Sequence, residues 1–378
     1  MKTLKDIKKT KNVRALVRVD YNVPFKNGKI LDTRRIDASF ETIKSLHKKG
    51  FQTLLIAHLG DSKATLKPVA KYLSKYFKIV FITEDIKNTE KIKNLCSQVS
   101  QDTIILFENI RFYQEEKENS IVFSKALARL ADIFVNEAFP ESHRKYASIV
   151  GIPKYLPSYA GVQLEKEIKM LSPLFTNKKH PFLFILGGAK FGTKIPLLKK
   201  FIDISDNVVI TGAILNSFYK FVGFEVGDSV VEGGYEKEIK KLISSPKILL
   251  PVDVLVVRSG AKKLVMANEV QKGDVIVDIG KQSVELINQK IKKSKIIIWN
   301  GPTGWYEKGF VGATKSLAQS IKTSKAFAIV GGGDTGAVIE KVLGEKENSK
   351  NIFVSTGGGA TLEYLASGTL VGVKYLKD

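Results

Sequence analysis

The stretch FLFILGGAK at residues 182–190 decides the fold of the second half of the chain. Its apolar run predicts a buried strand, and a glycine pair follows directly. Glycine lets a backbone approach a phosphate closely, and ligands of open parallel sheets bind beyond the carboxyl ends of the strands. One such segment is ordinary turn chemistry, but several at one edge indicate a nucleotide site. Similar glycine segments follow four other predicted strands: TGA at 211–213, NGPTG at 300–304, GGGDTG at 331–336 and STGGGA at 355–360.

Strand and helix patterns alternate along both halves, which is typical of βαβ units with a parallel sheet. We therefore predict an α/β fold of two doubly wound, Rossmann-like parallel sheets. In the second half the strands are predicted at 182–186, 207–211, 248–250, 296–299, 326–330 and 352–355. In the first half we predict strands at 14–19, 53–57, 103–107 and 133–135, and helices at 38–49, 67–76 and 122–131.

The length of 378 residues also favours two domains, because it exceeds what one ordinary core organises. A segment rich in proline and glycine precedes residues 163–174, where apolar residues recur at positions 164, 168, 171 and 174. That spacing predicts a helix, which we interpret as a linker and hinge. The predicted lobes are 1–162 and 175–362.

The composition is that of a globular protein, with 44% hydrophobic and 26% charged residues. No apolar run approaches the roughly 18–20 residues that span a bilayer. The N-terminus is basic without an apolar segment, so we expect no secretory signal. Cys96 is the single cysteine and cannot form an internal disulfide. We therefore expect a cytoplasmic protein with no membrane partner.

The formal net charge of +22 is compatible with binding to nucleic acid, to an anionic membrane or to anionic small substrates. It could also reflect solvated surface lysines, and the spread of lysines along the whole chain favours this interpretation over nucleic-acid binding. Only eight of the 60 basic residues are arginine, and seven of these precede residue 145. Arginine can donate two parallel hydrogen bonds to a phosphate or a carboxylate, which lysine cannot, so the arginines are the more informative residues.

Basic and polar side chains recur after the predicted strands of the first half. VRVDYNVP at 17–24 places Asp20 and Asn22 on the same side of an ending strand. His58, Arg111 and the pair His143–Arg144 each follow a different strand, and Arg34–Arg35 begins a helix. Each feature alone could cap a turn or lie on the surface. Their recurrence indicates an anion-binding site.

Two motifs of the second half point to phosphate. GGGDTG matches the dinucleotide-binding pattern G-x-G-x-x-G, so a dehydrogenase remains an alternative function. Asp334 within it would repel a phosphate unless a cation intervened, which favours a Mg²⁺–nucleotide complex. GGAKFGTK at 187–194 fails the P-loop pattern, but Lys190 and Lys194 would share one helix face if the segment were helical.

Taken together, these motifs closely resemble the phosphoglycerate kinase family over residues 1–376. The resemblance implies a bilobed hinge kinase that moves a phosphoryl group reversibly between ATP and the carboxylate of 3-phosphoglycerate, in glycolysis or gluconeogenesis. It further implies Mg²⁺ as the cofactor and a monomer. The motifs occur in the family's order: RVDYNVP, TRRI, AHLG, ENIRFY, VNEAF, GIPKYLPSYAG, ILGGAK, WNGPTGWYE, GGGDT and VSTGGGATLE.

The resemblance also assigns roles to residues, with Arg35 and Lys190 as the catalytic pair. Residues 363–378 would pack back on the first lobe. The 3-phosphoglycerate residues would be Asp20, Asn22, Arg35, His58, Arg111 and Arg144. The nucleotide residues would be Lys190, Lys194, Gly212, Asn300, Pro302, Glu307, Gly333, Asp334 and Thr335, with Asp334 as the metal ligand.

One departure from the family pattern changes a charge. Asp61 stands where the family usually has an arginine after His-Leu-Gly, and a carboxylate there would repel an anionic substrate. Smaller departures, such as Phe191–Gly192, Pro140 and Phe353, remove no central charge. Two other functions stay open: a weakened homologue that binds nucleic acid or membrane through its basic surface, and a Rossmann-type dehydrogenase. The retention of Arg35, Lys190, Asp334 and Thr335 argues against the former.

Overall fold

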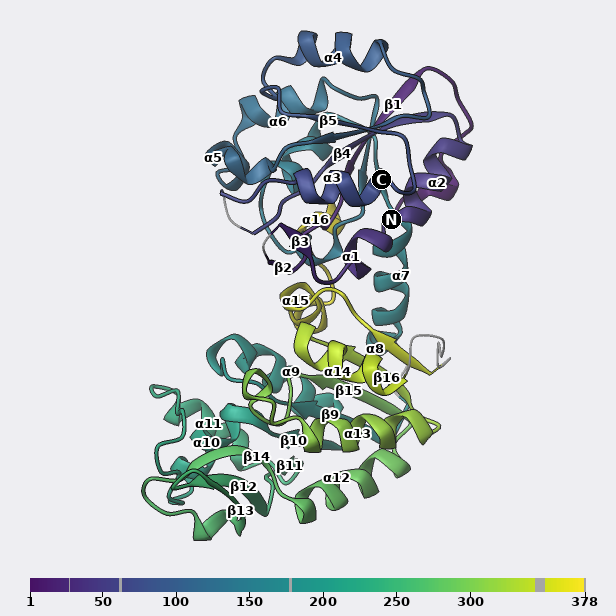
Figure 1. The fold of residues 1–378 in the computed structure, drawn as a ribbon. Helices are drawn as coiled ribbons and strands as arrows, with labels where there is room; N and C mark the ends of the chain where they lie inside the picture. Colours follow the sequence, from purple (N-terminus) through teal and green to yellow (C-terminus); the bar gives the residue numbers. More distant parts are fainter. Residues whose placement is uncertain (27, 61–62, 177–178, 344–350, 377–378) are drawn as a thin grey trace. The chain divides into compact units, whose positions relative to one another are not determined.

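The chain divides into two compact units in a computed structural model. Unit 1 comprises Met1–Met170 with Ser367–Asp378, and unit 2 comprises Leu171–Ala366 (Figure 1). The structure describes residues 1–26, 28–60, 63–176, 179–343 and 351–376, with positions 176, 333, 334, 337, 340 and 343 described by their backbone only. Asp61 therefore lies outside the described residues.

Unit 1 is built on a six-stranded sheet in the order β5-β6-β4-β1-β7-β8, and every neighbouring pair is parallel. The four predicted strands are its central members. The two edge strands, β5 and β8, were not predicted; β5 is only partly buried and β8 has only three residues. The strands are β1 Val13–Arg18, β4 Phe51–Ile56, β5 Ile79–Ile82, β6 Ile104–Phe107, β7 Ile133–Asn136 and β8 Ser158–Ala160.

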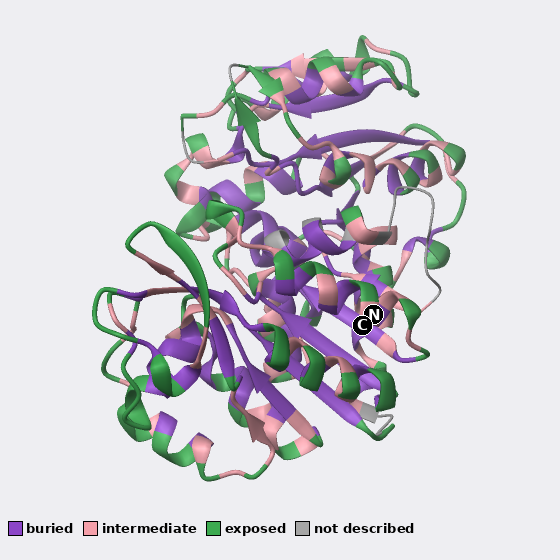
Figure 2. Cartoon of the chain, turned by 60° about the horizontal axis from the view of Figure 1, so that its bottom comes forward, coloured by how far each residue is buried: buried purple, intermediate pink, exposed green. Residues whose placement is uncertain are grey.

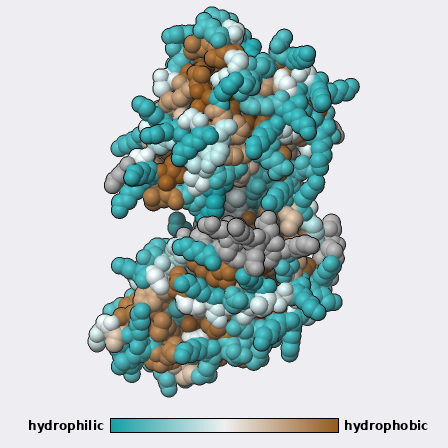
Figure 3. Space-filling view, turned by 45° about the vertical axis from the view of Figure 1, so that its right-hand side comes forward, coloured by the Kyte–Doolittle hydropathy of each residue, from teal (hydrophilic) through white to brown (hydrophobic). Residues whose placement is uncertain are grey.

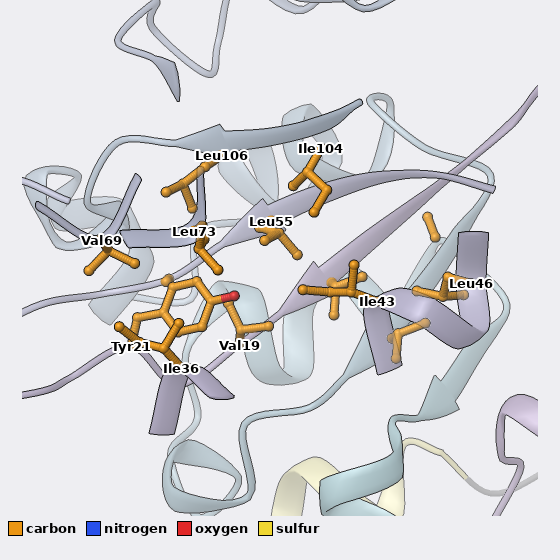
Figure 4. Close-up of a cluster of buried hydrophobic side chains, with 14 of the residues drawn as sticks. Val19, Tyr21, Ile36, Ile43, Leu46, Leu55, Val69, Leu73, Ile104 and Leu106 are labelled. Atoms are coloured by element: carbon orange, nitrogen blue, oxygen red, sulfur yellow. The ribbon is translucent and has the colours of Figure 1, made fainter. Parts of the chain in front are cut away.

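Helices cover both faces of this sheet, as a doubly wound fold requires. Ala15 and Val17 of β1 join a core cluster with α2 and α3, whereas Leu16 faces the opposite cluster with α4 and α6. Figure 4 shows the first cluster, where Tyr21 and Ile36 lie beside Val69 and Leu73. The strands are buried while the helices keep exposed outer faces (Figure 2). Hydrophobic burial on both faces of the sheet therefore organises unit 1.

The helix predicted at 163–174 is divided. α7 ends at Leu171 and α8 begins at Pro173, because a proline lacks the N–H that would continue α7. The other helices of unit 1 are α1 Arg34–Asp37, α2 Phe40–Lys48, α3 Lys67–Leu73, α4 Thr89–Ser97, α5 Gln114–Lys117, α6 Ile121–Ala128, α7 Val162–Leu171 and α16 Val371–Lys374. Short turns lie at η1 Leu4–Asp6, η2 Ile110–Phe112, η3 Phe139–Glu141, η4 Ala147–Gly151 and η5 Ile152–Lys154, and a hairpin joins β2 Phe25–Lys26 to β3 Lys29–Ile30.

Unit 2 contains a second parallel sheet, in the order β11-β10-β9-β15-β16-β17. All six strands match predicted segments. Its central strands end in register, with Asn300 of β15 opposite Leu186 of β9 and Gly331 of β16. The strands are β9 Phe182–Leu186, β10 Asn207–Ile210, β11 Ile248–Leu249, β15 Ile296–Asn300, β16 Phe327–Gly331 and β17 Ile352–Val354.

An antiparallel sheet of three strands, β13-β12-β14, was not predicted from the sequence. Its strands are β12 Asp253–Arg258, β13 Ala261–Met266 and β14 Val275–Ile279. The helices of unit 2 are α8 Pro173–Thr176, α9 Ile195–Ile204, α10 Gly212–Phe221, α11 Glu236–Ile243, α12 Lys281–Lys293, α13 Gly312–Thr323, α14 Gly333–Leu343 and α15 Gly359–Ser367. Short turns lie at η6 Gly192–Lys194, η7 Ala267–Glu269 and η8 Tyr306–Lys308.

Hydrophilic side chains cover most of the visible face of each unit in Figure 3. Of the helices in the described part of the chain, none combines the length and the apolar character needed to cross a membrane.

The buried carboxylate of Asp253 joins the antiparallel sheet to α12. It accepts hydrogen bonds from the backbone of Gln282 (3.0 Å) and Ser283 (2.8 Å) and from the Ser283 hydroxyl (2.6 Å). These are the N–H groups that a helix leaves unpaired in its first turn, so Asp253 caps α12 from another element.

We expect Asp253→Ala to lower the free energy of unfolding of unit 2 by about 2 kcal/mol, because buried donors lose a charged acceptor. Both tryptophans, Trp299 and Trp305, lie in unit 2, so their fluorescence during urea unfolding reports this unit. Asp228→Ala, at an exposed position, is the control. Equal unfolding midpoints for the two variants would show that the cap contributes nothing.

Candidate functional site

The loop after β1 carries the first predicted group of residues. Asp20, which is buried, accepts a hydrogen bond from Arg35 Nη1 at 2.9 Å and from the backbone of Asn22 at 3.2 Å. The same Arg35 nitrogen donates to the Asn22 carbonyl at 3.3 Å. Burial raises the pKa of Asp20, and the charge of Arg35 opposes that rise. The loop is therefore tied to α1 by an ion pair.

Gly60 connects this loop to the segments that follow β4 and β6. Its N–H donates to Asn22 Oδ1 at 2.9 Å, and its carbonyl accepts from Arg111 Nη1 at 2.8 Å. The carboxyl ends of parallel strands lie at one edge of the sheet, so residues distant in sequence meet here.

Glu141, at the end of η3, gathers the remaining predicted residues. Its Oε2 accepts from Arg111 Nη2 at 3.1 Å and lies 3.2 Å from Arg144 Nε, although that N–H is not aligned for a hydrogen bond. Its Oε1 lies 3.8 Å from His58 Nε2. Three of the six residues predicted for the acid substrate, His58, Arg111 and Arg144, thus meet at a carboxylate that the sequence analysis did not single out. The other three, Asp20, Asn22 and Arg35, are connected to Arg111 through Gly60. We call this set the arginine cluster: Asp20, Asn22, Arg35, His58, Arg111, Glu141 and Arg144.

A fully buried arginine supports the cluster from behind. Arg18 donates to His58 Nδ1 (3.1 Å), Ser148 Oγ (2.9 Å) and the Val19 carbonyl (2.5 Å). Ser148 in turn donates from its hydroxyl and its N–H to the buried carboxylate of Glu116, at 2.5 and 2.9 Å. Burial raises the pKa of Glu116, against the pull of the Arg18 charge. The two buried charges, Arg18 and Glu116, are thus opposite in sign and separated only by Ser148.

His58 is held as a neutral imidazole with a defined tautomer. Burial, together with the charges of Arg18, Arg111 and Arg144, places its pKa far below the usual range. A guanidinium can only donate, so Nδ1 accepts from Arg18 and the proton resides on Nε2. Among the described residues, none accepts a hydrogen bond from Nε2. His58 thus holds an N–H donor available to a ligand.

In unit 2, three of the glycine segments meet in backbone-to-backbone contact. Gly187 N–H donates to the Asn300 carbonyl (2.8 Å), Gly188 to Pro302 (3.0 Å) and Gly212 to Thr303 (3.0 Å). Gly212 has φ +64°, and a Cβ there would lie 2.4 Å from Gly188 N. Only glycine fits such an approach. The segments after β9, β10 and β15 therefore form one continuous edge.

The two lysines of GGAKFGTK do not share a helix face. Lys190 precedes the 3₁₀ turn η6 and is exposed. Lys194 ends that turn, is buried, and donates from Nζ to the Gly187 carbonyl. Burial lowers the pKa of Lys194 to about 8. The condition for a shared helix face is not met, because α9 begins only at Ile195, after both lysines, and Glu232 accepts the Phe191 N–H at 2.5 Å.

A cavity of about 290 Å³ adjoins this edge. Three of the residues predicted for the nucleotide line it, namely Gly212, Pro302 and Glu307. Its remaining wall is mainly apolar and comes from α10 and the antiparallel strand β14. The other lining residues are Gly188, Ala189, Ala213, Leu215, Asn216, Val230, Val275–Ile279, Thr303, Gly304 and Trp305.

Asp278 of β14 forms part of the cavity wall and was not singled out from the sequence. Burial raises its pKa to about 6. Thr303 Oγ1 donates to it at 2.8 Å, and the backbone N–H of Ala313 donates at 3.1 Å. Asp278 thereby fixes the loop after β15 to the first turn of α13.

The GGGDTG segment leads from β16 into α14. Gly333 and Asp334 are described by their backbone only, so the side chain of the predicted metal ligand lies outside the description. Thr335 is fully buried, and no described residue pairs with its Oγ1. Asn300 is buried at the end of β15 opposite Gly331. Asn300 and Thr335 therefore lie at the same sheet edge as the glycine segments.

Comparisons with known proteins agree with this geometry. A family profile described as Phosphoglycerate kinase matches residues 4–368. The chain belongs to the phosphoglycerate kinase family. Phosphoglycerate kinases of Dictyoglomus turgidum and Finegoldia magna are 39% and 40% identical, covering 100% of this chain and 99% of each relative. Phosphoglycerate kinase from Coxiella burnetii superposes with a TM-score of 0.82 at 32% identity, covering 99% of this chain and 97% of that one. That of Pyrococcus horikoshii gives 0.85 at 28%, covering 100% and 98%.

The family assignment confirms the resemblance drawn from the motifs, including the α/β fold with two parallel sheets. The sequence analysis of this phosphoglycerate kinase family member missed Arg18, Glu116, Glu141 and Asp278 as site residues. Arg18 and Asp278 each interrupt an apolar strand with a charge, which is a usable signal. Glu116 and Glu141 carry no such signal, because both lie in polar segments of the sequence.

We expect the imidazole of His58 to stay neutral, with its proton on Nε2, over the range from about pH 8 to about pH 5 in which an unperturbed histidine titrates. Heteronuclear NMR of ¹⁵N-labelled histidine side chains, assigned with His58→Gln, reports both properties. The same protein in denaturant is the control, since all its histidines should then titrate. A His58 signal that moves with pH through this range in the folded protein would contradict the assignment.

Proposed function

We propose that the chain is an active phosphoglycerate kinase, transferring a phosphoryl group reversibly between ATP and the carboxylate of 3-phosphoglycerate to give 1,3-bisphosphoglycerate and ADP. The observation that carries this proposal is the division of chemistry between the units. Unit 1 gathers three arginines and a neutral histidine at one sheet edge. Unit 2 offers a glycine-lined edge, a buried lysine and an apolar cavity.

The arginine cluster suits a small acid with a carboxylate and a phosphate. Guanidinium groups match both anions with paired donors. In the proposal Arg35, Arg111 and Arg144 take the negative charges, and His58 donates from Nε2. Asp20 and Asn22 position Arg35 and Gly60 through the hydrogen bonds already described. Asp20 would also accept a hydrogen bond from the hydroxyl group of 3-phosphoglycerate.

The cavity of unit 2 suits a nucleobase, because its wall is apolar and flanked by backbone. Gly212 and Pro302 would contact the nucleoside, and Glu307, at the cavity rim, would bind a ribose hydroxyl. Asn300 would lie beside the phosphates. Lys194 lies next to Gly188 on the same edge, and Lys190 is exposed to solvent, so both can approach phosphates.

A phosphate with its Mg²⁺ is the ligand that we propose for the start of α14. The unpaired hydroxyl of buried Thr335 shows an unmet hydrogen-bonding need there, and the backbone of Gly333 begins a helix whose N–H groups favour anions. We propose that Asp334 holds the ion and Thr335 the adjacent phosphate. When bound, Mg²⁺ neutralises charge on the transferred phosphate.

The proposed transfer needs no general base, because the attacking carboxylate is already ionised. The remaining barrier is charge repulsion and alignment, which Arg35 and Lys190 would lower by stabilising the transferred phosphoryl oxygens. Approach of the two lobes about a hinge in residues 163–174 would exclude water that could otherwise hydrolyse ATP. The proposal includes a cytoplasmic monomer acting in glycolysis or gluconeogenesis, on the strength of the family.

A coupled assay with 3-phosphoglycerate and a panel of nucleoside triphosphates tests this function. We expect turnover with ATP, and stabilisation of the protein by ADP in a thermal shift. No turnover with any nucleotide, combined with salt-dependent binding of DNA or RNA, would instead support the weakened homologue. Enhanced NADH fluorescence without ADP binding would support the dehydrogenase.

Lys190→Ala and Arg35→Ala should each lower kcat by about a hundredfold or more, because each removes a charge that acts on the transferred group. ADP affinity, measured by calorimetry, should change little. Lys199→Ala, at an exposed position of α9, is the control and should retain full turnover. Near-normal kcat in either test variant would remove that residue from the catalytic pair.

ADP affinity should fall as the pH rises above about 8, the pKa of Lys194 in the free protein. Phosphate next to the amine favours its charged form, so binding takes up a proton wherever the free lysine is neutral. The dissociation constant should therefore increase, approaching about tenfold per pH unit above this pKa. Calorimetry between about pH 7 and 9.5 measures the slope. An identical slope in Lys194→Met would show that another group titrates.

A further inference from the structure

We infer that Glu141 is a resident anion of the arginine cluster: its carboxylate occupies guanidinium groups that an anionic ligand would otherwise take, and the acid substrate displaces it on binding. Glu141 is thus a specificity-determining residue. The inference rests on the proposed function only for the identity of the substrate. The internal occupancy is a property of unit 1 alone.

Two of the five N–H donors of Arg111 are already committed. Nη1 donates to the Gly60 carbonyl and Nη2 to Glu141 Oε2. Its Nε is buried and has no partner among the described residues. A ligand anion that approaches Arg111 at the N–H group that Glu141 uses must therefore compete with Glu141.

The contact with Arg144 is poorer and easier to exchange. Arg144 Nε lies 3.2 Å from the same Oε2, but the N–H is misaligned and makes no hydrogen bond. Its Nη1 donates to the Tyr146 hydroxyl at 3.2 Å. One carboxylate oxygen therefore serves two guanidiniums and satisfies only one of them. A phosphate, with three acceptor oxygens, could satisfy both.

Solvent reaches the arginines more readily than it reaches the carboxylate. The exposed fraction of the side chain is 40% for Arg144, 34% for Arg35 and 14% for Arg111, against 7% for Glu141. An incoming ligand thus meets the guanidiniums first, with Glu141 behind them. Displacement requires the glutamate side chain to turn away from Arg111 and Arg144, which are both more exposed than Glu141.

The charge balance explains why this matters for selectivity. Arg35 pairs with Asp20, while Arg111 and Arg144 share Glu141. Among the described residues of the arginine cluster, three guanidiniums thus face two carboxylates, and His58 is neutral. A bare inorganic anion engages Arg111 and Arg144 alone, so it must make up for the lost Glu141 contacts from these two groups only. A ligand that carries both a phosphate and a carboxylate also reaches Arg35. Glu141 therefore discriminates against inorganic phosphate and sulfate.

Glu141→Gln tests the inference, because it keeps the side-chain shape and removes the charge. The matched control is Glu118→Gln, which makes the same change of net charge at an exposed position of the same unit. Sulfate binding, measured by calorimetry without any turnover, should tighten by about tenfold in Glu141→Gln, the factor expected for releasing one charge-assisted hydrogen bond. Glu118→Gln should match the wild type.

Kinetics give the second measurement. In Glu141→Gln the KM for 3-phosphoglycerate should fall while kcat and the KM for ATP stay within about twofold, since the nucleotide groups lie in unit 2 and a binding change need not alter the chemical step. The preference for 3-phosphoglycerate over sulfate, taken as the ratio of the sulfate inhibition constant to KM, should decrease.

The opposite result has a clear meaning. If Glu141 is instead a scaffold that aligns Arg111 and Arg144, Glu141→Gln raises the KM and leaves sulfate binding unchanged or weaker, and the inference is overturned. Glu141→Ala is the second variant should the glutamine protein not fold, with the same expected directions for sulfate. If the wild type shows no turnover, the proposed function fails, yet the sulfate titration still decides the role of Glu141.

Discussion

The in-register ending of the parallel strands is the constraint on which the rest of unit 2 depends. Asn300 lies opposite both Leu186 and Gly331, so the chain must leave three neighbouring strands at the same level. The loops that follow these strands therefore start side by side, with backbone packed against backbone. A Cβ at Gly301 would lie 2.2 Å from the Gly187 carbonyl oxygen, which restricts that position to glycine. The register of the strands thus requires glycine at these positions, and two of the glycines, Gly188 and Gly212, line the cavity.

Charges placed behind the sheet edges obey a second constraint, the cost of leaving water. Arg18 and Glu116 are both fully buried, and Ser148 bridges them, accepting a hydrogen bond from Arg18 and donating one to Glu116. Asp278 is bonded to Thr303 and Ala313. Lys194 differs, because its ammonium donates to a neutral carbonyl. Burial lowers its pKa, and an anion bound beside it would stabilise the charged form.

The sequence was sufficient for the central strands and insufficient for contacts between distant residues. Strands buried on both faces read as continuous apolar runs, so β1, β4, β9 and β15 were predictable. The strand β13, AKKLVM, is largely exposed and carries no such run, which is why the antiparallel sheet escaped prediction. For the site, strand ends located Asp20 and His58. Glu141 could not be found, because its role depends on meeting Arg111 across 30 residues of sequence.

Local pairing, and not the total charge, determines what the arginine cluster can bind. The chain carries a formal net charge of +22, yet Arg35, Arg111 and Arg144 each have a carboxylate within 3.2 Å. Surfaces that bind nucleic acid gain affinity from unpaired cations that release counterions from phosphates. A cluster whose cations are already paired gains affinity only by exchanging partners, which depends on geometry. Such a site favours a ligand of defined shape with several anionic groups.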